Sequence, residues 1–215
     1  MKKIFTLILT CIMMFALPAC QNAADSSEKT QTPETIAKEE VTMTKKSETM
    51  PEETTGGTKK ELIVYFSWSG NTESVAKEIE KQTGADVFRI VPTEAYTDDY
   101  DTLLDIAQKE QQSGARPAIS GSIKNFDSYE IVYLGYPNWW GDMPMILYSF
   151  LDDYDLSGKT IIPFVTSGGS GFSNTISTIE NMEPNALVLD GLSLLNSQTD
   201  APHDAVADWL SGLGL

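Results

Sequence analysis

Apolar runs alternate with amphipathic stretches along the last 155 residues. Five short runs are apolar nearly throughout: residues 61–66, 86–91, 130–135, 160–166 and 186–190. Between them, apolar side chains recur every three or four residues, which is typical of one face of a helix. Strands without polar alternation are buried on both faces of a sheet. We therefore expect one α/β domain: a three-layer, doubly wound, five-stranded parallel sheet.

Five helices are expected between and after these strands. The pattern predicts the first over residues 72–82, and it starts the third at Pro144, because proline is well tolerated in the first helical turn. Apolar stripes mark the other three: Tyr100, Leu103, Leu104 and Ala107; Phe172, Ile176 and Ile179; and Val206, Trp209, Leu210 and Leu213. Ligands of such sheets bind beyond the carboxyl ends of the strands. The loops after the first, third and fourth strands are therefore the places for chemistry.

The first twenty residues have the pattern of an export signal. Lys2 and Lys3 precede an apolar run over residues 4–19, which is shorter than the roughly 20 residues of a membrane-spanning helix. The run ends at Leu17-Pro18-Ala19-Cys20, which resembles the lipobox of bacterial lipoproteins. That resemblance implies a signal peptide over residues 1–19, a diacylated Cys20 and a lipid anchor on the extracytoplasmic face of the membrane. A plain signal peptide with a chance cysteine is the alternative.

Residues 20–60 are expected to form a disordered tether. They contain no aromatic residue and are rich in Thr, Glu, Lys and Ser. Such a segment cannot bury enough apolar surface to offset the entropy of ordering it. The domain boundary is therefore placed at residue 61, with the folded domain over residues 61–215.

Composition excludes several classes of function. The 215 residues include 15 Lys plus Arg and 31 Asp plus Glu, a net charge of −16, which argues against nucleic-acid binding and favours basic partners. Cys11 and Cys20 are the only cysteines, and both precede the domain. Disulfides, iron–sulfur ligation and a cysteine nucleophile are thereby excluded from it. His203 is the only histidine, which excludes a multi-His metal site; a site of carboxylates alone stays open, and no metal ligand is predicted.

The loop after the first strand has the composition of an anion-binding turn. It reads Ser67-Trp68-Ser69-Gly70-Asn71-Thr72 and leads into a helix. Gly70 permits a tight turn, and the backbone N–H groups at a helix N-terminus attract anions. The loop has no Lys or Arg, which excludes a Walker loop and favours a single phosphate monoester. An ordinary strand–turn–helix connection is the alternative.

The other two loops favour a flat ligand. Trp139 and Trp140 stand in a Gly/Pro-rich loop after the third strand, where they would wall an aromatic ring and gain ~1 kcal/mol by stacking. A hydrophobic plug beneath a helix is the alternative. Three glycines in residues 166–172 let the backbone approach a ligand edge, with N–H groups for ring carbonyls and nitrogens. A planar ring carrying one phosphate fits all three loops, and FMN is the obvious candidate.

Over residues 61–215 the chain resembles the flavodoxin family. Its first loop matches the family's phosphate-loop pattern, Ser/Thr-x-Ser/Thr-Gly-x-Thr, and PNWWGDMP and TSGGSG resemble the flavin loops of a bacterial subgroup. The resemblance implies FMN and the strand order 2-1-3-4-5. It also implies three sets of cofactor-binding residues: Ser67, Ser69, Gly70, Asn71 and Thr72 around the phosphate, with Trp68 in the same loop; Pro137, Asn138, Trp139, Trp140 and Gly141 on the isoalloxazine; and Ser167, Gly168 and Gly169 on its other edge.

The function that follows from the resemblance is FMN-dependent electron transfer at the membrane surface, to a redox partner protein or a small electron acceptor. An FMN-dependent NAD(P)H/quinone-type reductase is the main alternative, because the third loop is neutral where ordinary short-chain flavodoxins carry acidic and aromatic residues. A serine hydrolase built on Ser170, Asp190 and His203 is a weaker one, since Phe172 replaces the second glycine of the nucleophile elbow. A flavin-free binding module is the fourth.

Asp142 is the carboxylate expected to tune the cofactor. It stands directly after the two tryptophans and Gly141, and a negative charge beside a flavin disfavours its anionic reduced form. The hypothesis is that Asp142→Asn raises the reduction potential in a spectroelectrochemical titration. An unchanged potential would remove Asp142 from the account.

Overall fold

Six parallel strands form the sheet in the computed structural model, which describes residues 59–214. The strands are β1 (Glu61–Tyr65), β2 (Asp86–Arg89), β3 (Ile131–Pro137), β4 (Thr160–Ser167), β5 (Leu187–Val188) and β6 (Leu192–Leu195). Their order is β2-β1-β3-β4-β5, with β6 also paired to β4, and this confirms the expected fold class. The predicted signal peptide, Cys20 and nearly all of the predicted tether lie outside the described residues.

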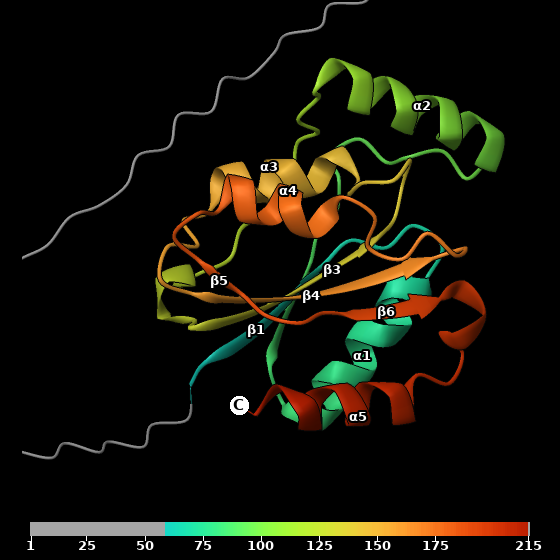
Figure 1. Ribbon diagram of the computed structural model, residues 1–215. Helices are drawn as coiled ribbons and strands as arrows, with labels where there is room; N and C mark the ends of the chain where they lie inside the picture. Colours follow the sequence, from blue (N-terminus) through green and yellow to red (C-terminus); the bar gives the residue numbers. More distant parts are fainter. Residues whose placement is uncertain (1–58, 215) are drawn as a thin grey trace, which may run out of the picture. The chain divides into compact units, whose positions relative to one another are not determined.

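Helices cover both faces of the sheet (Figure 1). They are α1 (Asn71–Thr83), α2 (Tyr100–Ser113), α3 (Met145–Asp153), α4 (Thr175–Met182) and α5 (His203–Leu213). Helices α3 and α4 lie on one face, and α1 and α5 lie on the other. Two short 3-10 helices, Phe126–Ser128 and Asn196–Gln198, complete the regular structure of the described part of the chain.

Side chains of the central strands alternate between two hydrophobic cores. In β1, Leu62 and Val64 pack with Ile146 and Phe150 of α3. The neighbouring Ile63 and Tyr65 belong to the second core, with residues of α1 and α5. Because both faces are buried, the strand has no polar alternation, which is why the sequence pattern identified it as a central parallel strand.

The fifth strand differs from its prediction. The expected strand over residues 186–190 is only the two-residue β5, and residues 189–191 separate it from β6. Leu189 donates its N–H to the carbonyl of Ile161, so alternate residues of β4 face this edge. Pro163 is the next residue of β4 that faces this edge, and proline has no backbone N–H to donate. A Cβ on Gly191 would lie 2.5 Å from the Pro163 carbonyl oxygen, so the ladder breaks where β4 cannot donate.

Helix α2 does not cover the sheet as its apolar stripe suggested. It lies at the end of the sheet where the strands finish, and it packs against α3 (Figure 1). Residues 91–93 and 118–120 pair across its base, through N–H bonds from Thr93 to Ala118 and from Ser120 to Val91. As a result β2 is an edge strand with little cover, and Val87 is 41% exposed.

Two helix starts also moved. Helix α3 begins at Met145, with Pro144 as the residue before it, and α4 begins at Thr175, so Phe172 packs onto the core from the preceding loop. These shifts are small, since the apolar residues that marked the helices still face the sheet. None of the helices within residues 59–214 is long and apolar enough to pass through a bilayer.

Candidate functional site

A cleft of about 420 Å³ opens at the carboxyl ends of β3 and β4. Small-molecule sites commonly have volumes of about 300–1,000 Å³. All three loops singled out from the sequence contribute to its walls. The lining residues are Trp68, Ser69, Asn71, Pro137, Asn138, Trp139, Trp140, Thr166, Ser167, Gly168, Ser170 and Asn196, together with Tyr100, Leu103, Leu104 and Ala107 of α2.

The first loop turns sharply into α1. Gly70 has φ +92°, which L side chains rarely adopt, and its N–H donates to Ser67 Oγ over 3.2 Å. Within residues 59–214, no acceptor is found for the backbone N–H groups of Ser69, Asn71 and Thr72. These donors stand at the positive end of a 13-residue helix. The loop therefore has the unpaired donors of an anion site.

Two of the predicted phosphate ligands are used inside the fold. Thr72 is buried, and its hydroxyl shares a 2.9 Å hydrogen bond with Thr166 Oγ1. Ser67 is buried too, with its hydroxyl occupied by the Gly70 N–H. Their side chains shape the loop, and only Ser69 and Asn71 of the polar residues in this loop line the cleft.

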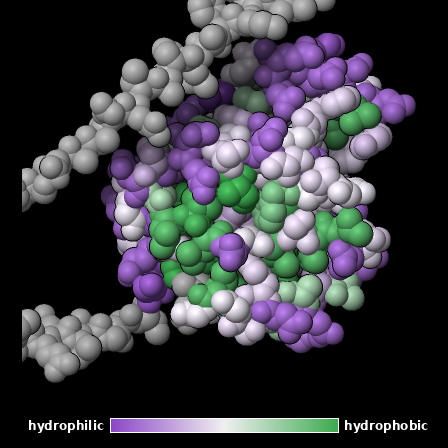
Figure 2. Space-filling model, viewed as in Figure 1, coloured by the Kyte–Doolittle hydropathy of each residue, from purple (hydrophilic) through white to green (hydrophobic). Residues whose placement is uncertain are grey.

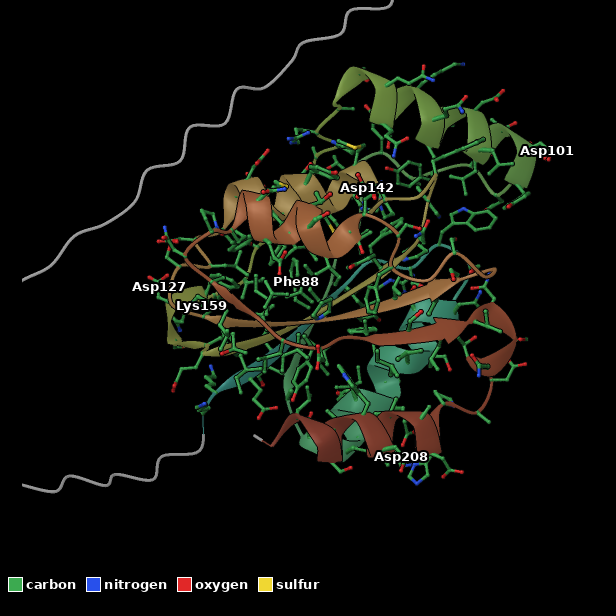
Figure 3. All side chains as sticks on the ribbon, viewed as in Figure 1. Phe88, Asp101, Asp127, Asp142, Lys159 and Asp208 are labelled. Atoms are coloured by element: carbon green, nitrogen blue, oxygen red, sulfur yellow. The ribbon has the colours of Figure 1, made fainter. Side chains whose placement is uncertain are left out.

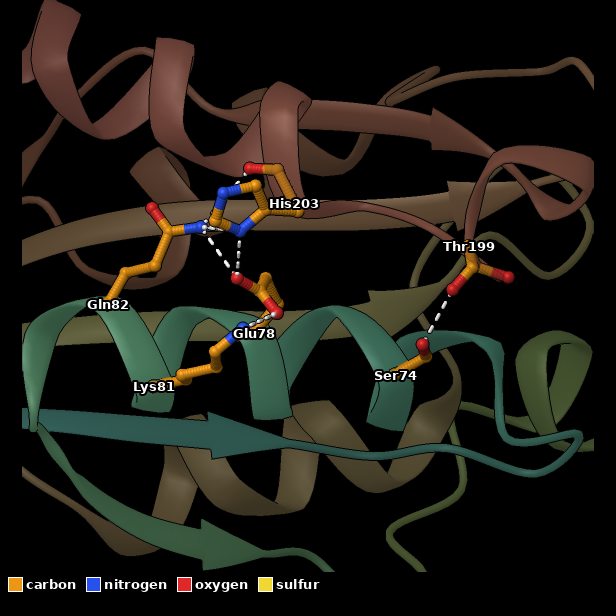
Figure 4. Close-up of polar contacts among 6 residues, drawn as sticks. All are labelled: Ser74, Glu78, Lys81, Gln82, Thr199 and His203. Carbon is orange, nitrogen blue, oxygen red and sulfur yellow. Dashed lines mark hydrogen bonds and ion pairs between the residues drawn. The ribbon is translucent and has the colours of Figure 1, made fainter.

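The far side of the first loop is tied to the segment before α5. Asn71 Oδ1 accepts from Thr199 Oγ1 over 3.1 Å. Ser74 Oγ donates to the Thr199 carbonyl over 2.6 Å (Figure 4). One turn further along α1, Glu78 bonds His203 Nδ1 over 2.6 Å. Hydrogen bonds from Gln82 and His203 lower the pKa of Glu78 to about 2. This network holds Asn196 at the rim of the cleft, and no local sequence signal marked that residue.

The tryptophans form the apolar wall, each in a different way. Trp139 is half-buried and meets the rings of Phe66 and Tyr96 edge to face, with centroids 5.5 Å apart in each pair. Trp140 is 49% exposed at φ +54°, and its indole donates to the Leu104 carbonyl of α2 over 3.1 Å. A bulky residue in this conformation is strained, and such strain clusters at ligand sites. The hydrophobic-plug alternative fits Trp139 in part and does not fit Trp140.

Helix α2 supplies further wall residues. Tyr100 is 59% exposed and lies against Trp68, with ring centroids 6.1 Å apart, and Trp68 itself donates to the Thr97 carbonyl over 2.9 Å. The stripe read from the sequence as core-facing thus lines the cleft. An apolar stripe shows that a helix face needs cover, and here part of that cover is a cavity.

Asn138 joins the second loop to the third. Its Nδ2 donates to the Gly171 carbonyl over 2.8 Å and to Ser173 Oγ over 3.0 Å, while its Oδ1 accepts from the Gly141 N–H over 3.1 Å. The resemblance implied a contact with the ring; Asn138 lines the cleft, and its amide makes three hydrogen bonds within the two loops. Its role is to set the spacing of the walls.

The third loop has fewer available N–H groups than expected. Ser167 is buried, and its Oγ accepts from Gly169 over 3.2 Å and from Gly171 over 3.0 Å. In the described part of the chain, the N–H groups of Gly168 and Ser170 remain without an acceptor, and both residues line the cleft. Gly141 and Gly169 take positive φ values that let their loops turn and are not among the lining residues.

Asp142 is not among the residues that line the cleft, and its predicted effect on the reduction potential stays a prediction. Its Oδ2 accepts from the Tyr148 hydroxyl over 2.6 Å, and its Oδ1 accepts from the Met143 N–H over 2.8 Å. Figure 3 shows it beside α3. Burial and this bond to Asp142 raise the pKa of Tyr148 to about 12. The carboxylate is a turn and helix-anchoring group, and it does not line the space where a ring would lie.

The hydrolase alternative is wrong in geometry. His203 bonds Glu78 and Gln82 of α1, whereas Ser170 lies in the cleft and the Asp190 carbonyl accepts from the indole of Trp209. The three residues are therefore not joined as a triad. Among residues 59–214, no group of three or more His, Cys, Asp or Glu side chains is arranged to hold a metal ion.

Arg89 is a charged residue that reading the loops alone had missed. It ends β2, in register with Tyr65 of β1, and its guanidinium reaches the Ser67 carbonyl over 3.5 Å and Glu73 Oε2 over 3.0 Å. The first loop contains no basic residue, and the neighbouring strand supplies one beneath it. Arg89 can be placed near Ser67 only when it is known that β1 and β2 are neighbours in the sheet.

Comparisons with known proteins agree with this architecture. Residues 60–213 match the family model described as flavodoxin. A protein from Bacteroides eggerthii described as a flavoprotein is 31% identical, with a TM-score of 0.65, covering 73% of this chain and 98% of its own. One from Bacteroides uniformis, described in the same way, is 29% identical, with a TM-score of 0.65 and coverages of 71% and 98%.

A third structure shares the fold at lower identity. The flavoprotein of Lactobacillus acidophilus, solved in complex with FMN, is 23% identical with a TM-score of 0.58, covering 69% of this chain and 99% of its own. The comparison with curated proteins returned no match.

Proposed function

This chain belongs to the flavodoxin family, and on that premise we propose that it binds FMN in the cleft and carries electrons between redox partners. The proposal rests on two features that lie in the same cleft. Unpaired N–H groups at the N-terminus of α1 and an apolar wall of Trp139, Trp140 and Tyr100 belong to one cleft. Anion donors beside aromatic walls suit a planar ring that carries a phosphate.

Different residues hold the phosphate and the ring of FMN in this proposal. The N–H groups of Ser69, Asn71 and Thr72 take the phosphate, with the side chains of Ser69 and Asn71 at the cleft. Trp139, Trp140 and Tyr100 wall the ring, and the N–H groups of Gly168 and Ser170 meet its polar edge. When bound, FMN supplies one- or two-electron redox chemistry. The protein contributes orientation and exclusion of water.

The test is the visible absorption spectrum of the purified full chain, as isolated and after FMN is added and the sample desalted. We expect a retained flavin band whose shape differs from that of free FMN. Trp139→Ala should weaken retention, because it removes stacking and the edge-to-face contacts with Phe66 and Tyr96. Ser211→Ala, on α5 and outside the cleft lining, is the matched control. Absence of retained flavin in the unaltered chain would contradict the proposal.

The reductase alternative is separated by a second assay. A carrier exchanges electrons with a reduced protein or dye and does not consume NAD(P)H by itself. Steady NAD(P)H oxidation by the flavin-loaded chain with an added quinone would instead assign the reductase function. The exposed position of Trp140 leaves the cleft accessible to small molecules, so this assay belongs beside the first.

We also propose that the carrier acts at the extracytoplasmic membrane surface, attached through Cys20. Support comes from the basic start, the apolar run and the lipobox-like end of residues 1–20. Two acyl chains give stable anchoring where one does not. Cys20→Ala should move the protein from the membrane fraction to the soluble fraction and abolish labelling by radioactive palmitate. Unchanged labelling would contradict the anchor.

A further inference from the structure

Two cations hold a carboxylate in the first turn of α1. Arg89 Nη1 lies 3.0 Å from Glu73 Oε2, and Lys77 Nζ lies 2.7 Å from Glu73 Oε1. The Glu73 side chain is only 23% exposed, against 47% for Arg89. Arg89 also donates to the Ser67 carbonyl over 3.5 Å, so one guanidinium links the phosphate loop to this carboxylate.

The negative charge of Glu73 opposes the binding of a phosphate at the loop. An acidic side chain in the first turn stabilises a helix through its dipole. The same negative charge stands one residue after Thr72, whose N–H is among the unpaired donors of the anion site. The hydrogen bond from Lys77, aided by the charge of Arg89, lowers the pKa of Glu73, so the carboxylate is ionised at neutral pH. Uncompensated, it would repel a phosphate dianion.

We propose that Arg89 makes the site select FMN over riboflavin, by neutralising Glu73 beside the phosphate and by fixing the carbonyl of Ser67. This rests on the proposed function. Arg89 is a positioning residue in this account: it acts through Glu73 and through the loop backbone. Its effect belongs to the phosphate and not to the ring, because the aromatic wall is built from Trp139, Trp140 and Tyr100, which Arg89 does not contact.

The experiment compares the dissociation constants of FMN and riboflavin for the full chain, measured by quenching of flavin fluorescence. Arg89→Gln should weaken FMN binding about fivefold, because Lys77 alone then compensates the charge of Glu73, and leave riboflavin binding nearly unchanged. Arg89→Lys keeps the charge and should retain most of the selectivity. Glu73→Gln should restore FMN binding to Arg89→Gln.

Arg116→Gln is the control for net charge. Arg116 is also paired with a carboxylate, Asp152, and it does not line the cleft. This variant should leave the FMN-to-riboflavin ratio unchanged. A change as large as that of Arg89→Gln would mean that overall charge sets the ratio, and would overturn the proposal.

Three other outcomes would also overturn it. If Arg89→Gln weakens the binding of FMN and of riboflavin equally, Arg89 only stabilises the loop and does not act on the phosphate. Weakening that persists undiminished in the Glu73→Gln background would mean that Arg89 does not act through Glu73. An unaltered chain that binds neither flavin would remove the proposed function and this inference together, and is distinguished from the first two because those require a flavin-binding parent.

Discussion

At the scale of single residues, Asn138 determines how the second and third loops are spaced. Its side chain makes three hydrogen bonds to them, and Asn138→Ala leaves the Gly141 N–H and the Gly171 carbonyl without these partners. We expect a loss of about 2 kcal/mol in the free energy of unfolding and weaker FMN binding. Chemical denaturation and flavin titration measure the two effects. Ser173→Ala removes one of the bonds and should cost clearly less; equal costs would contradict this assignment.

Glu183, at the end of α4, makes the stability of the domain depend on pH. Burial raises its pKa to about 7 from an ordinary value of 4.5, with repulsion from Asp155 and Asp152 adding to the effect. The folded state therefore holds this proton more tightly than the unfolded state, and stability falls as the pH rises from about 4.5 through 7. Glu183→Gln should raise Tm at pH 8 and change it little at pH 4.5.

The exposed Glu180 on the same helix provides the control for this prediction. Glu180→Gln should shift Tm equally at both pH values, or not at all. Parallel shifts for Glu183→Gln would contradict the pH dependence. Thermal melts at the two pH values suffice.

Two glycines should respond oppositely to alanine. A Cβ at Gly135 of β3 would overlap the ring of Phe164 on β4, whereas a Cβ at Gly212 of α5 meets nothing. Gly135→Ala should lower the free energy of unfolding by about 1–3 kcal/mol through overpacking. Gly212→Ala should raise it by about 0.5–1 kcal/mol through helix propensity. Urea denaturation measures the free energy of unfolding of both variants. An unchanged value for Gly135→Ala would contradict the close packing of β3 against β4.

At the scale of elements, α2 is the least supported helix around the cleft. It packs mainly against α3 and against the open space of the site, and its stem is the pairing of residues 91–93 with 118–120. Elements with few buried contacts exchange their amide hydrogens faster. We expect α2 to exchange faster than α1 and α3, and to slow when FMN binds. Hydrogen exchange followed by mass spectrometry tests this, with α5 as reference, and protection equal to that of α3 before FMN is added would contradict it.

The elements also show what sequence reading can reach. The strands and most helices were predictable because a two-sided sheet demands apolar runs, and the three loops were predictable because the strand ends of such a sheet carry its ligands. The position of α2 was not, because an apolar stripe is the same whether a helix covers a sheet or a cleft. The break after β5 was missed although Pro163 and Gly191 both signal it.

The sequence also singled out some residues of the cleft and missed others. Trp139, Trp140 and Ser69 were found because their types are unusual or suitable in a loop. Arg89 was missed because its contact with Ser67 depends on which strands are neighbours. The inward bonds of Thr72 and Asp142 were missed because a sequence does not show which way a polar side chain turns.

At the scale of the whole molecule, charge is the dominant feature. Residues 61–215 contain 23 acidic and 7 basic side chains, a net −16. Figure 2 shows hydrophilic residues gathered over α2, the helix that borders the cleft. Such a field draws cations toward the cleft and repels anions.

Electron transfer from the reduced protein should therefore depend on salt in opposite directions for two acceptors. Oxidation by hexaammineruthenium(III) should slow as salt rises from about 0.01 M to about 0.15 M, over which the Debye length falls from about 30 Å to about 8 Å. Oxidation by ferricyanide should accelerate over the same range. Stopped-flow rates measure both, and a common direction would contradict electrostatic steering by this domain.

The interruption between β5 and β6 has a consequence for how copies of the protein meet. Leu187 and Leu195 are exposed along this edge, and a long, straight edge with such side chains would invite a strand from another molecule. Because the edge is divided into segments of two and four residues, an incoming strand finds no continuous ladder to extend. Under the proposed attachment through Cys20, copies of the protein on one membrane would meet often. Gly191 and Pro163 thus favour separate molecules over aggregates.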